Sequence, residues 1–170
     1  MKDYVIASGN EKEFVSMGEK LGYSELVFIG KADLSKIKTK LKLTTSTRIF
    51  KSSSKDRELI ESKKADVIYE FEQEQRKDHT HFRNSGINQV IAKLMKDKKV
   101  IYGISFNQIL KASPKEQAVL LGRMMQNIRI FRKYKVSMIV GSFASNPYEM
   151  RDFKDLVSFA KTLGLNEYKA

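Results

Sequence analysis

Short apolar runs alternate with stretches of helical periodicity from one end of the chain to the other. Runs rich in β-branched and aromatic residues predict strands at 4–7, 25–29, 47–50, 65–71, 100–105 and 136–140. Apolar residues at three- and four-residue spacing predict helices at 10–21, 54–64, 84–95, 113–134 and 146–163, and a Lys-rich helix or turn at 34–41. Because parallel strands need crossover connections, this alternation predicts an α/β fold with a mostly parallel sheet.

Three of the predicted helices have explicit start signals. Asn10 precedes Glu13 by three residues, which is the spacing of a capping box. The sequence Ser113-Pro114-Lys115-Glu116 adds proline at the first helical position, and Asn146-Pro147-Tyr148-Glu149 repeats that arrangement. These signals predict helix starts at residues 10, 113 and 146.

The length of 170 residues fits a single α/β domain spanning residues 1–170. About six or seven strands are compatible with an open doubly wound sheet or with an irregular, incomplete barrel. A regular eight-fold barrel takes roughly 250 residues, more than this chain has. The polar run that begins at residue 72 predicts a mobile loop near 72–82, too short to link two domains.

Charge is the most informative feature of the composition. There are 32 Lys and Arg residues against 20 Asp and Glu, a formal net charge of +12. Such a surplus attracts polyanions, of which nucleic acid is the commonest, although a generically basic surface is the alternative. The absence of cysteine suits a reducing compartment, and no stretch approaches the roughly 18 apolar residues of a membrane span. We therefore expect a cytoplasmic protein without a membrane partner.

Both histidines of the chain, His79 and His81, lie within three residues of each other. They could share a metal ion, but a catalytic site usually needs a third protein ligand, which Asp66, Glu70 or Glu72 would have to supply. A solvated loop is the favoured interpretation, so no metal site is predicted.

Sequence motifs for other catalytic chemistry are missing. No Gly-x-x-x-x-Gly-Lys phosphate loop is present. Ser142 follows a predicted strand, but it lacks the Gly-x-Ser-x-Gly context of a nucleophile. We predict no catalytic residue and no cofactor bound by the protein.

Basic residues recur at spacings that place them together on helix faces. Gln126, Arg129 and Lys133 share one face of the predicted helix 113–134, away from its apolar stripe. Clusters of this kind neutralise phosphates, although solvated helix faces are ordinarily basic as well. The face argument selects four candidate RNA-binding residues: Lys93, Lys96, Arg123 and Arg129.

The stretch from His81 to Lys93 reads His-Phe-Arg-Asn-Ser-Gly-Ile-Asn-Gln-Val-Ile-Ala-Lys. It resembles the signature of the ribonuclease P protein component 3 family. The resemblance continues through residues 130–136, 142–145 and 163–165, and includes Arg151-Asp152. It covers roughly residues 80 to 166, whereas the first 75 residues match only in their βα rhythm and are shorter than is usual in the family.

The resemblance implies a TIM-barrel-like fold and a place in ribonuclease P, the endoribonuclease that removes the 5′ leader of precursor tRNA. It implies three partners: the ribonuclease P RNA, a small ferredoxin-like protein subunit, and precursor tRNA through the complex. The RNA and its Mg²⁺ ions are expected to perform the hydrolysis, while the protein neutralises backbone charge.

The resemblance also implies roles for individual residues. Ser85, Gly86 and Asn88 are expected to shape the signature turn. The apolar stripe that follows independently predicts that Asn84 or Ser85 caps the next helix. Asn84 stands where the family usually has Asp, and Arg83 is either an RNA contact or a buried structural arginine. The residues expected to contact RNA on the strength of the resemblance are Arg83, Arg132, Lys133 and Arg151.

Two other hypotheses remain. One is a metal-dependent phosphoesterase on a related barrel that uses His79 and His81. The other is a generic nucleic-acid-binding domain unrelated to tRNA processing.

Overall fold

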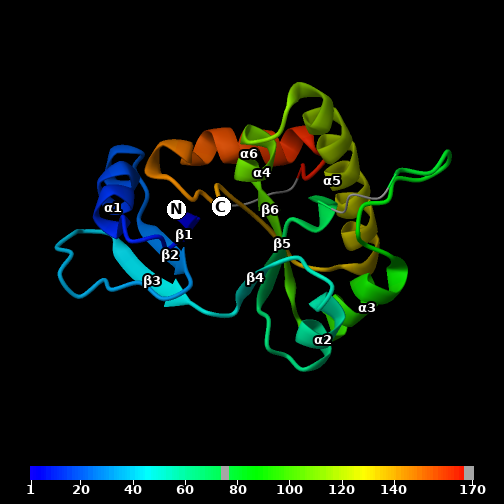
Figure 1. Ribbon diagram of the computed structural model, residues 1–170, viewed down its shortest axis with the longest axis horizontal. Helices are drawn as coiled ribbons and strands as arrows, with labels where there is room; N and C mark the ends of the chain where they lie inside the picture. The colour runs from blue at the N-terminus through cyan, green and yellow to red at the C-terminus, as the bar shows by residue number, and fades with distance from the viewer. Residues whose placement is uncertain (74–76, 167–170) are drawn as a thin grey trace.

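The computed structural model describes residues 1–73 and 77–166 (Figure 1). All strands in its two sheets are parallel. The three-stranded sheet has the order β1 (Lys2–Ile6), β2 (Glu25–Ile29), β3 (Lys42–Ser46). The four-stranded sheet has the order β4 (Ile49–Lys51), β5 (Val67–Tyr69), β6 (Ile101–Ser105), β7 (Met138–Gly141).

Helices connect the strands and cover the sheets. In chain order they are α1 (Glu11–Lys20), α2 (Asp56–Glu61), the 3-10 turn η1 (Phe71–Gln73), α3 (Gln89–Lys98), α4 (Phe106–Leu110), α5 (Pro114–Tyr134), the 3-10 turn η2 (Pro147–Glu149) and α6 (Phe153–Thr162). Figure 1 shows α3 and α5 along one end of the molecule, α6 across its top and α1 at the opposite end. None of the described helices combines the length and the apolar content needed to cross a bilayer.

The two sheets meet where β1 lies beside the end of β7. The Ile6 amide donates to the Ala144 carbonyl at 2.8 Å, next to an isolated bridge between Val5 and Ala144. The buried Asp3 carboxylate accepts the Ser142 amide at 2.7 Å and the Ser142 hydroxyl at 2.6 Å. Burial raises the pKa of Asp3 to about 6, against the hydrogen bonds that lower it. Ser142 is therefore a buried link between sheets.

Strand order continues from β3 through β1 and the bridge to β7 and on to β4, but the ring does not close. No ladder joins β3 to β4 within the described parts of the chain. The parallel α/β class is confirmed, whereas a TIM-like barrel is not.

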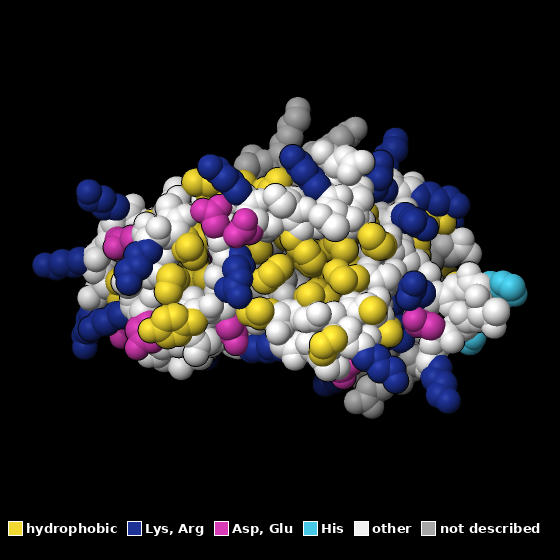
Figure 2. Space-filling model, turned by 90° about the horizontal axis from the view of Figure 1, so that it is seen from above, with side chains coloured by type: hydrophobic (Ala, Val, Ile, Leu, Met, Phe, Trp, Pro, Cys, Tyr) yellow, Lys and Arg dark blue, Asp and Glu magenta, His cyan; other side chains and the backbone are white. Residues whose placement is uncertain are grey.

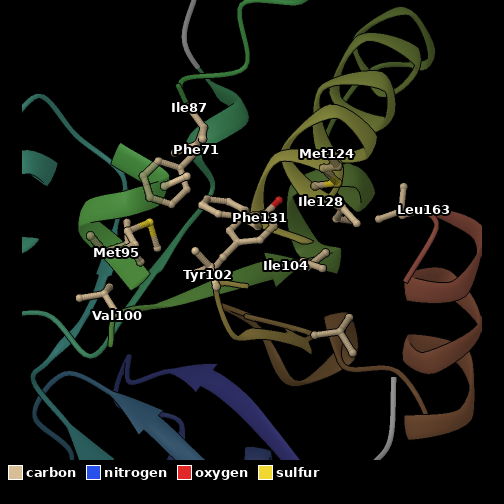
Figure 3. Packing of buried hydrophobic residues seen from close by; sticks show 14 of the residues in the cluster. Phe71, Ile87, Met95, Val100, Tyr102, Ile104, Met124, Ile128, Phe131 and Leu163 are labelled. Carbon is tan, nitrogen blue, oxygen red and sulfur yellow. The ribbon is translucent and has the colours of Figure 1, made fainter. Parts of the chain in front are cut away.

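The largest hydrophobic core packs α3, α5 and α6 against β5, β6 and β7. Tyr102 and Phe131 meet at its centre, with ring centroids 4.7 Å apart, and Phe71 packs against both (Figure 3). Burying an aromatic side chain contributes roughly 1.5–3 kcal/mol. This cluster gives α5, the longest helix, a fixed position on the sheet.

Several predicted elements need correction. The strand expected at 47–50 corresponds to β4, which begins two residues later, whereas β3 was not predicted, and 34–41 is not helical. The Asn10 side chain accepts a hydrogen bond from Ser8 at 2.6 Å and does not cap α1. The start signal at Asn146 produces only the short turn η2, because α6 begins after Asp152, whose carboxylate accepts the Lys154 amide. The capping interaction of Glu116 with Ser113 is confirmed.

The loop predicted at 72–82 is only partly described, since residues 74–76 lie outside the described residues. Its first residue, Glu72, is buried within η1. The mobility of the loop stays a prediction.

Candidate nucleic-acid interface

Residues 83–88, which we call the signature turn, make three hydrogen bonds with the side chain of Gln126 on α5. The Gln126 carbonyl oxygen accepts the Arg83 amide at 2.9 Å, and the Gln126 amide group donates to the Arg83 carbonyl at 2.6 Å. The same amide group donates to the Ser85 hydroxyl at 2.9 Å. Gln126 thus pairs with the turn in the way that a neighbouring strand would.

A buried polar network lies beneath the turn. Asn127 donates to the Ser85 carbonyl at 3.0 Å and to the Glu72 carboxylate at 2.7 Å. The Tyr102 hydroxyl donates to the same carboxylate oxygen at 2.5 Å. Burial raises the pKa of Glu72, although these hydrogen bonds act in the opposite direction. The network joins η1, β6, α5 and the turn through fully enclosed groups, which fixes their relative positions.

Gly86 is the residue of the signature turn for which the structure leaves no room for a side chain. Its φ is +77°, and a Cβ added there would lie 2.4 Å from the Phe71 carbonyl oxygen. Only glycine adopts this conformation freely and also permits so close an approach of backbone. The glycine expected to shape the signature turn therefore has a steric reason to be there.

The Asp78 carboxylate accepts hydrogen bonds from both the signature turn and α5. Its Oδ1 accepts the Asn84 amide at 2.9 Å and Nε of Arg123 at 2.9 Å. Arg123 also donates to the Glu72 carbonyl at 2.9 Å. Partial burial acts to raise the pKa of Asp78, but these hydrogen bonds and the charges of Arg123 and Arg83 lower it.

Two predicted residues have different places from those expected. Arg123, a candidate RNA contact, has only 7% of its side chain exposed and forms an ion pair with Asp78 instead of facing solvent. Asn84 does not cap a helix. The cap of α3 is Asn88, whose side-chain oxygen accepts the amides of Val90 at 2.9 Å and Ile91 at 3.0 Å. The carboxylate of Asp78 was missed, because nothing local in the sequence connects it with Arg123.

Arg83 lies flat against α5 where the helix lacks a side chain. A Cβ on Gly122 would meet the guanidinium carbon of Arg83 at 2.3 Å. Its Nη1 is 3.8 Å from the Asp78 carboxylate, and about half of the side chain, 47%, is exposed. The guanidinium is thus oriented by the fold and open to solvent on one side.

Further cations continue from Arg83 along the exposed sides of α5 and α3. Arg83 and Arg129 line the same hollow, and Lys133 follows Arg129 by one helical turn. Lys93 of α3 and Lys133 lie 5.9 Å and 5.8 Å from the ring of Tyr134, so the two helices contribute to one surface. We call this surface the basic strip; its members are Arg83, Arg129, Lys133, Lys93 and Lys96.

Arg132 and Arg151 are not brought into the basic strip. Arg132 donates to the Gly164 carbonyl at 3.2 Å, beyond the end of α6. Arg151 donates to the Met150 carbonyl at 2.8 Å, and its guanidinium lies 5.6 Å from the ring of Phe106. Their RNA contacts stay predictions.

His79 and His81 are exposed near the tip of a loop. The ring of His79 stacks on that of Phe82 with centroids 4.4 Å apart. Across residues 1–73 and 77–166, no three His, Asp or Glu side chains are grouped so that they could hold a metal ion.

The comparison with known families decides the affiliation. The family model described as RNase P subunit p30 matches residues 57–170, which include the signature turn, α3 and α5. The chain belongs to the RNase P subunit p30 family. The resemblance found in the sequence is thereby confirmed, and the first 56 residues lie outside the match.

Curated relatives of this p30-family chain agree with the match. Ribonuclease P protein component 3 of Methanosarcina acetivorans is 28% identical over 120 residues, covering 70% of this chain and 46% of that protein. The protein of the same name from Archaeoglobus fulgidus is 28% identical over 114 residues, covering 67% of this chain and 52% of that protein. The chain spans about half the length of the curated relatives it matches.

A solved structure supports the fold. The chain is similar to one in the cryo-EM structure of archaeal ribonuclease P with mature tRNA, with a TM-score of 0.76 and 20% sequence identity. The similarity covers 96% of this chain and 83% of that chain, so it extends to the N-terminal sheet that the family model leaves out.

Proposed function

We propose that this chain is an RNA-binding protein subunit of ribonuclease P, which removes the 5′ leader from precursor tRNA. The observation that carries the proposal is the basic strip beside a rigidly docked signature turn, in a chain of the p30 family. The RNA and its Mg²⁺ ions perform the hydrolysis in this proposal, and the protein supplies no catalytic group and no cofactor.

The strip suits a phosphate backbone physically. Each Lys or Arg that neutralises a phosphate releases condensed counterions, so affinity falls steeply with salt. Phosphate contacts of this kind fix register and orientation more than they read sequence. The network of Gln126, Asn127 and Asp78 holds the strip's anchor, Arg83, in place before the RNA arrives.

A different face suits the protein partner. Figure 2 shows hydrophobic side chains gathered in the middle of the face that α4, α5 and α6 form. On these helices Leu110 is 37% exposed and Val119 is 36% exposed. Apolar surface of this kind marks protein interaction sites, so we propose this face for the small ferredoxin-like subunit.

RNA binding at several salt concentrations tests the proposal. The doubly substituted chain Arg129→Ala/Lys133→Ala should bind the cognate ribonuclease P RNA more weakly, and its salt slope should fall by roughly 2, about 1 for each cation. Lys12→Ala/Lys20→Ala is the matched control, because both lysines are exposed on α1 at the opposite end of the molecule (Figure 1). Equal losses in the two double variants would refute the assignment of the strip.

The same assay separates the other two hypotheses. Equal affinity for the ribonuclease P RNA and for duplex DNA of similar charge would favour a generic nucleic-acid-binding domain. Hydrolysis of RNA by the protein alone, abolished by EDTA, would favour the metal-dependent phosphoesterase.

A further inference from the structure

Residues 78–83 form a hairpin, here called the arm, which projects beyond α5. The His79 amide donates to the Phe82 carbonyl at 2.9 Å and closes the arm near its tip. Asp78 ties its base to Arg123, as described above. In Figure 1 the arm extends away from the sheets at the α5 end, and in Figure 2 its histidines mark the outermost point of that end, with Lys and Arg side chains around it.

The arm presents an aromatic surface that the fold itself does not use. Phe82 is 59% exposed and belongs to none of the hydrophobic cores among the described residues. Its only described ring partner is the exposed His79, with centroids 4.4 Å apart and an angle of 26° between the planes. The two rings form a stacked pair in water.

The surroundings of this pair are basic. The arm and α5 enclose a hollow of about 500 Å³, to which Phe82, Arg83, Met125 and Arg129 contribute. Arg83 is oriented flat against Gly122, and Arg129 is exposed on the helix. An aromatic platform beside two guanidinium groups combines the features that recognise a single-stranded nucleotide: a ring for the base and cations for the phosphates.

We propose that the arm stacks on an unpaired nucleobase of RNA, while Arg83 and Arg129 hold the phosphates beside it. This inference rests on the proposed function and adds the class of RNA element that the chain recognises. Bases within a duplex are already stacked on each other and cannot reach the platform, so the arm selects a loop, a bulge or a strand end. A protein partner fits less well, since Phe82 is the one large apolar side chain of the arm and Arg83 and Arg129 line the hollow beside it.

Two RNA probes of equal length test the inference: a single strand that cannot pair with itself, and the same strand in a duplex. Stacking on one aromatic ring is worth roughly tenfold in affinity. Phe82→Ala should therefore weaken binding of the single strand about tenfold and change binding of the duplex by less than about twofold. Phe82→Trp should retain the preference.

Tyr148 offers a matched control, because it is an aromatic residue that is 79% exposed on η2, outside the arm. Tyr148→Ala should bind both probes as the unaltered chain does. The salt slope of Phe82→Ala should also be unchanged, because no phosphate contact is lost, whereas Arg129→Ala should lower the slope for both probes.

The outcomes separate this inference from the proposed function. If the unaltered chain binds the ribonuclease P RNA through the basic strip, but Phe82→Ala weakens both probes equally or neither, base stacking is refuted and the proposed function stands. No effect on either probe is also the result expected if Phe82 docks a protein. If the unaltered chain binds neither the probes nor the ribonuclease P RNA, both proposals fail.

Discussion

Replacing Gly86 by alanine isolates the steric demand of the signature turn. The substitution adds one methyl group at a φ of +77°, where the new Cβ would lie 2.4 Å from the Phe71 carbonyl oxygen. Gly22 is the matched control, since its φ is +74° and nothing lies within 4 Å of an added Cβ. Any difference between the two variants therefore reports the contact with Phe71 and not the backbone conformation.

The expected magnitudes follow from two contributions. A left-handed conformation costs a non-glycine residue about 1–2 kcal/mol, which is offset by about 0.4–1 kcal/mol because alanine restricts the unfolded chain. Gly22→Ala should thus cost about 1 kcal/mol of unfolding free energy. Gly86→Ala must also displace backbone in a packed region, at about 1–3 kcal/mol, giving about 2–4 kcal/mol in all. The displaced residue adjoins Glu72, so the network with Tyr102 and Asn127 is strained as well.

Urea denaturation of the two variants and the unaltered chain measures these values. The unfolding free energies should rank the unaltered chain first, Gly22→Ala second and Gly86→Ala last. If Gly86→Ala and Gly22→Ala differ by less than about 0.5 kcal/mol, the turn does not depend on its contact with Phe71, because the expected gap is about 1–3 kcal/mol.

Three further predictions concern the buried charges and the apolar face. Because burial raises the pKa of Asp3 from 3.8 to about 6, the stability contributed by its protonated form is present below pH 3.8 and lost as the pH rises to about 6. The unfolding free energy of Asp3→Asn, relative to that of the unaltered chain, should therefore rise by about 2 kcal/mol between pH 4 and pH 7 in urea denaturation. A constant difference would show that the carboxyl is not perturbed. Arg123→Ala should lower the unfolding free energy by about 2–4 kcal/mol, because the partly buried Asp78 loses its main partner. Arg123→Lys should restore only part of this stability, since lysine lacks the planar guanidinium fork. Full rescue by lysine would contradict the hydrogen bonds described for Arg123. Val119→Asp should abolish co-purification with the small protein subunit without weakening RNA binding, and retained co-purification would exclude that face.

Some elements could be predicted because their local signals are complete. The strand predicted at residues 25–29 contains the apolar run Leu26 to Ile29, which ends at Gly30, and the structure has the same bounds. The strand β3 was missed because, among the described residues, it pairs with β2 alone and its side chains are at best partly buried. The sequence therefore shows no apolar run there. An edge strand of this kind is defined by its neighbour and not by its own composition.

In the candidate site, too, features with a local sequence signal could be predicted, and features that depend on distant partners could not. The helical spacing of residues 126, 129 and 133 was sufficient to predict a basic face on α5. The burial of Arg123 could not be predicted, because its partner Asp78 lies 45 positions away in the sequence. The cap of α3 was assigned to Asn84 or Ser85, but α3 begins only at Gln89. The Asn84 amide is bound by Asp78, and Asn88 has the extended backbone of a cap, with its side chain accepting the first helical amides.

Cleavage of precursor tRNA by reconstituted ribonuclease P tests the central claim most directly. The cognate RNA with the small protein subunit would be assayed at moderate Mg²⁺, without and with this chain. We predict a clear rise in removal of the 5′ leader, which Arg129→Ala/Lys133→Ala abolishes and Lys12→Ala/Lys20→Ala leaves intact. No rise with the folded chain, or EDTA-sensitive cleavage by this chain without the RNA, would contradict its assignment as an RNA-binding subunit.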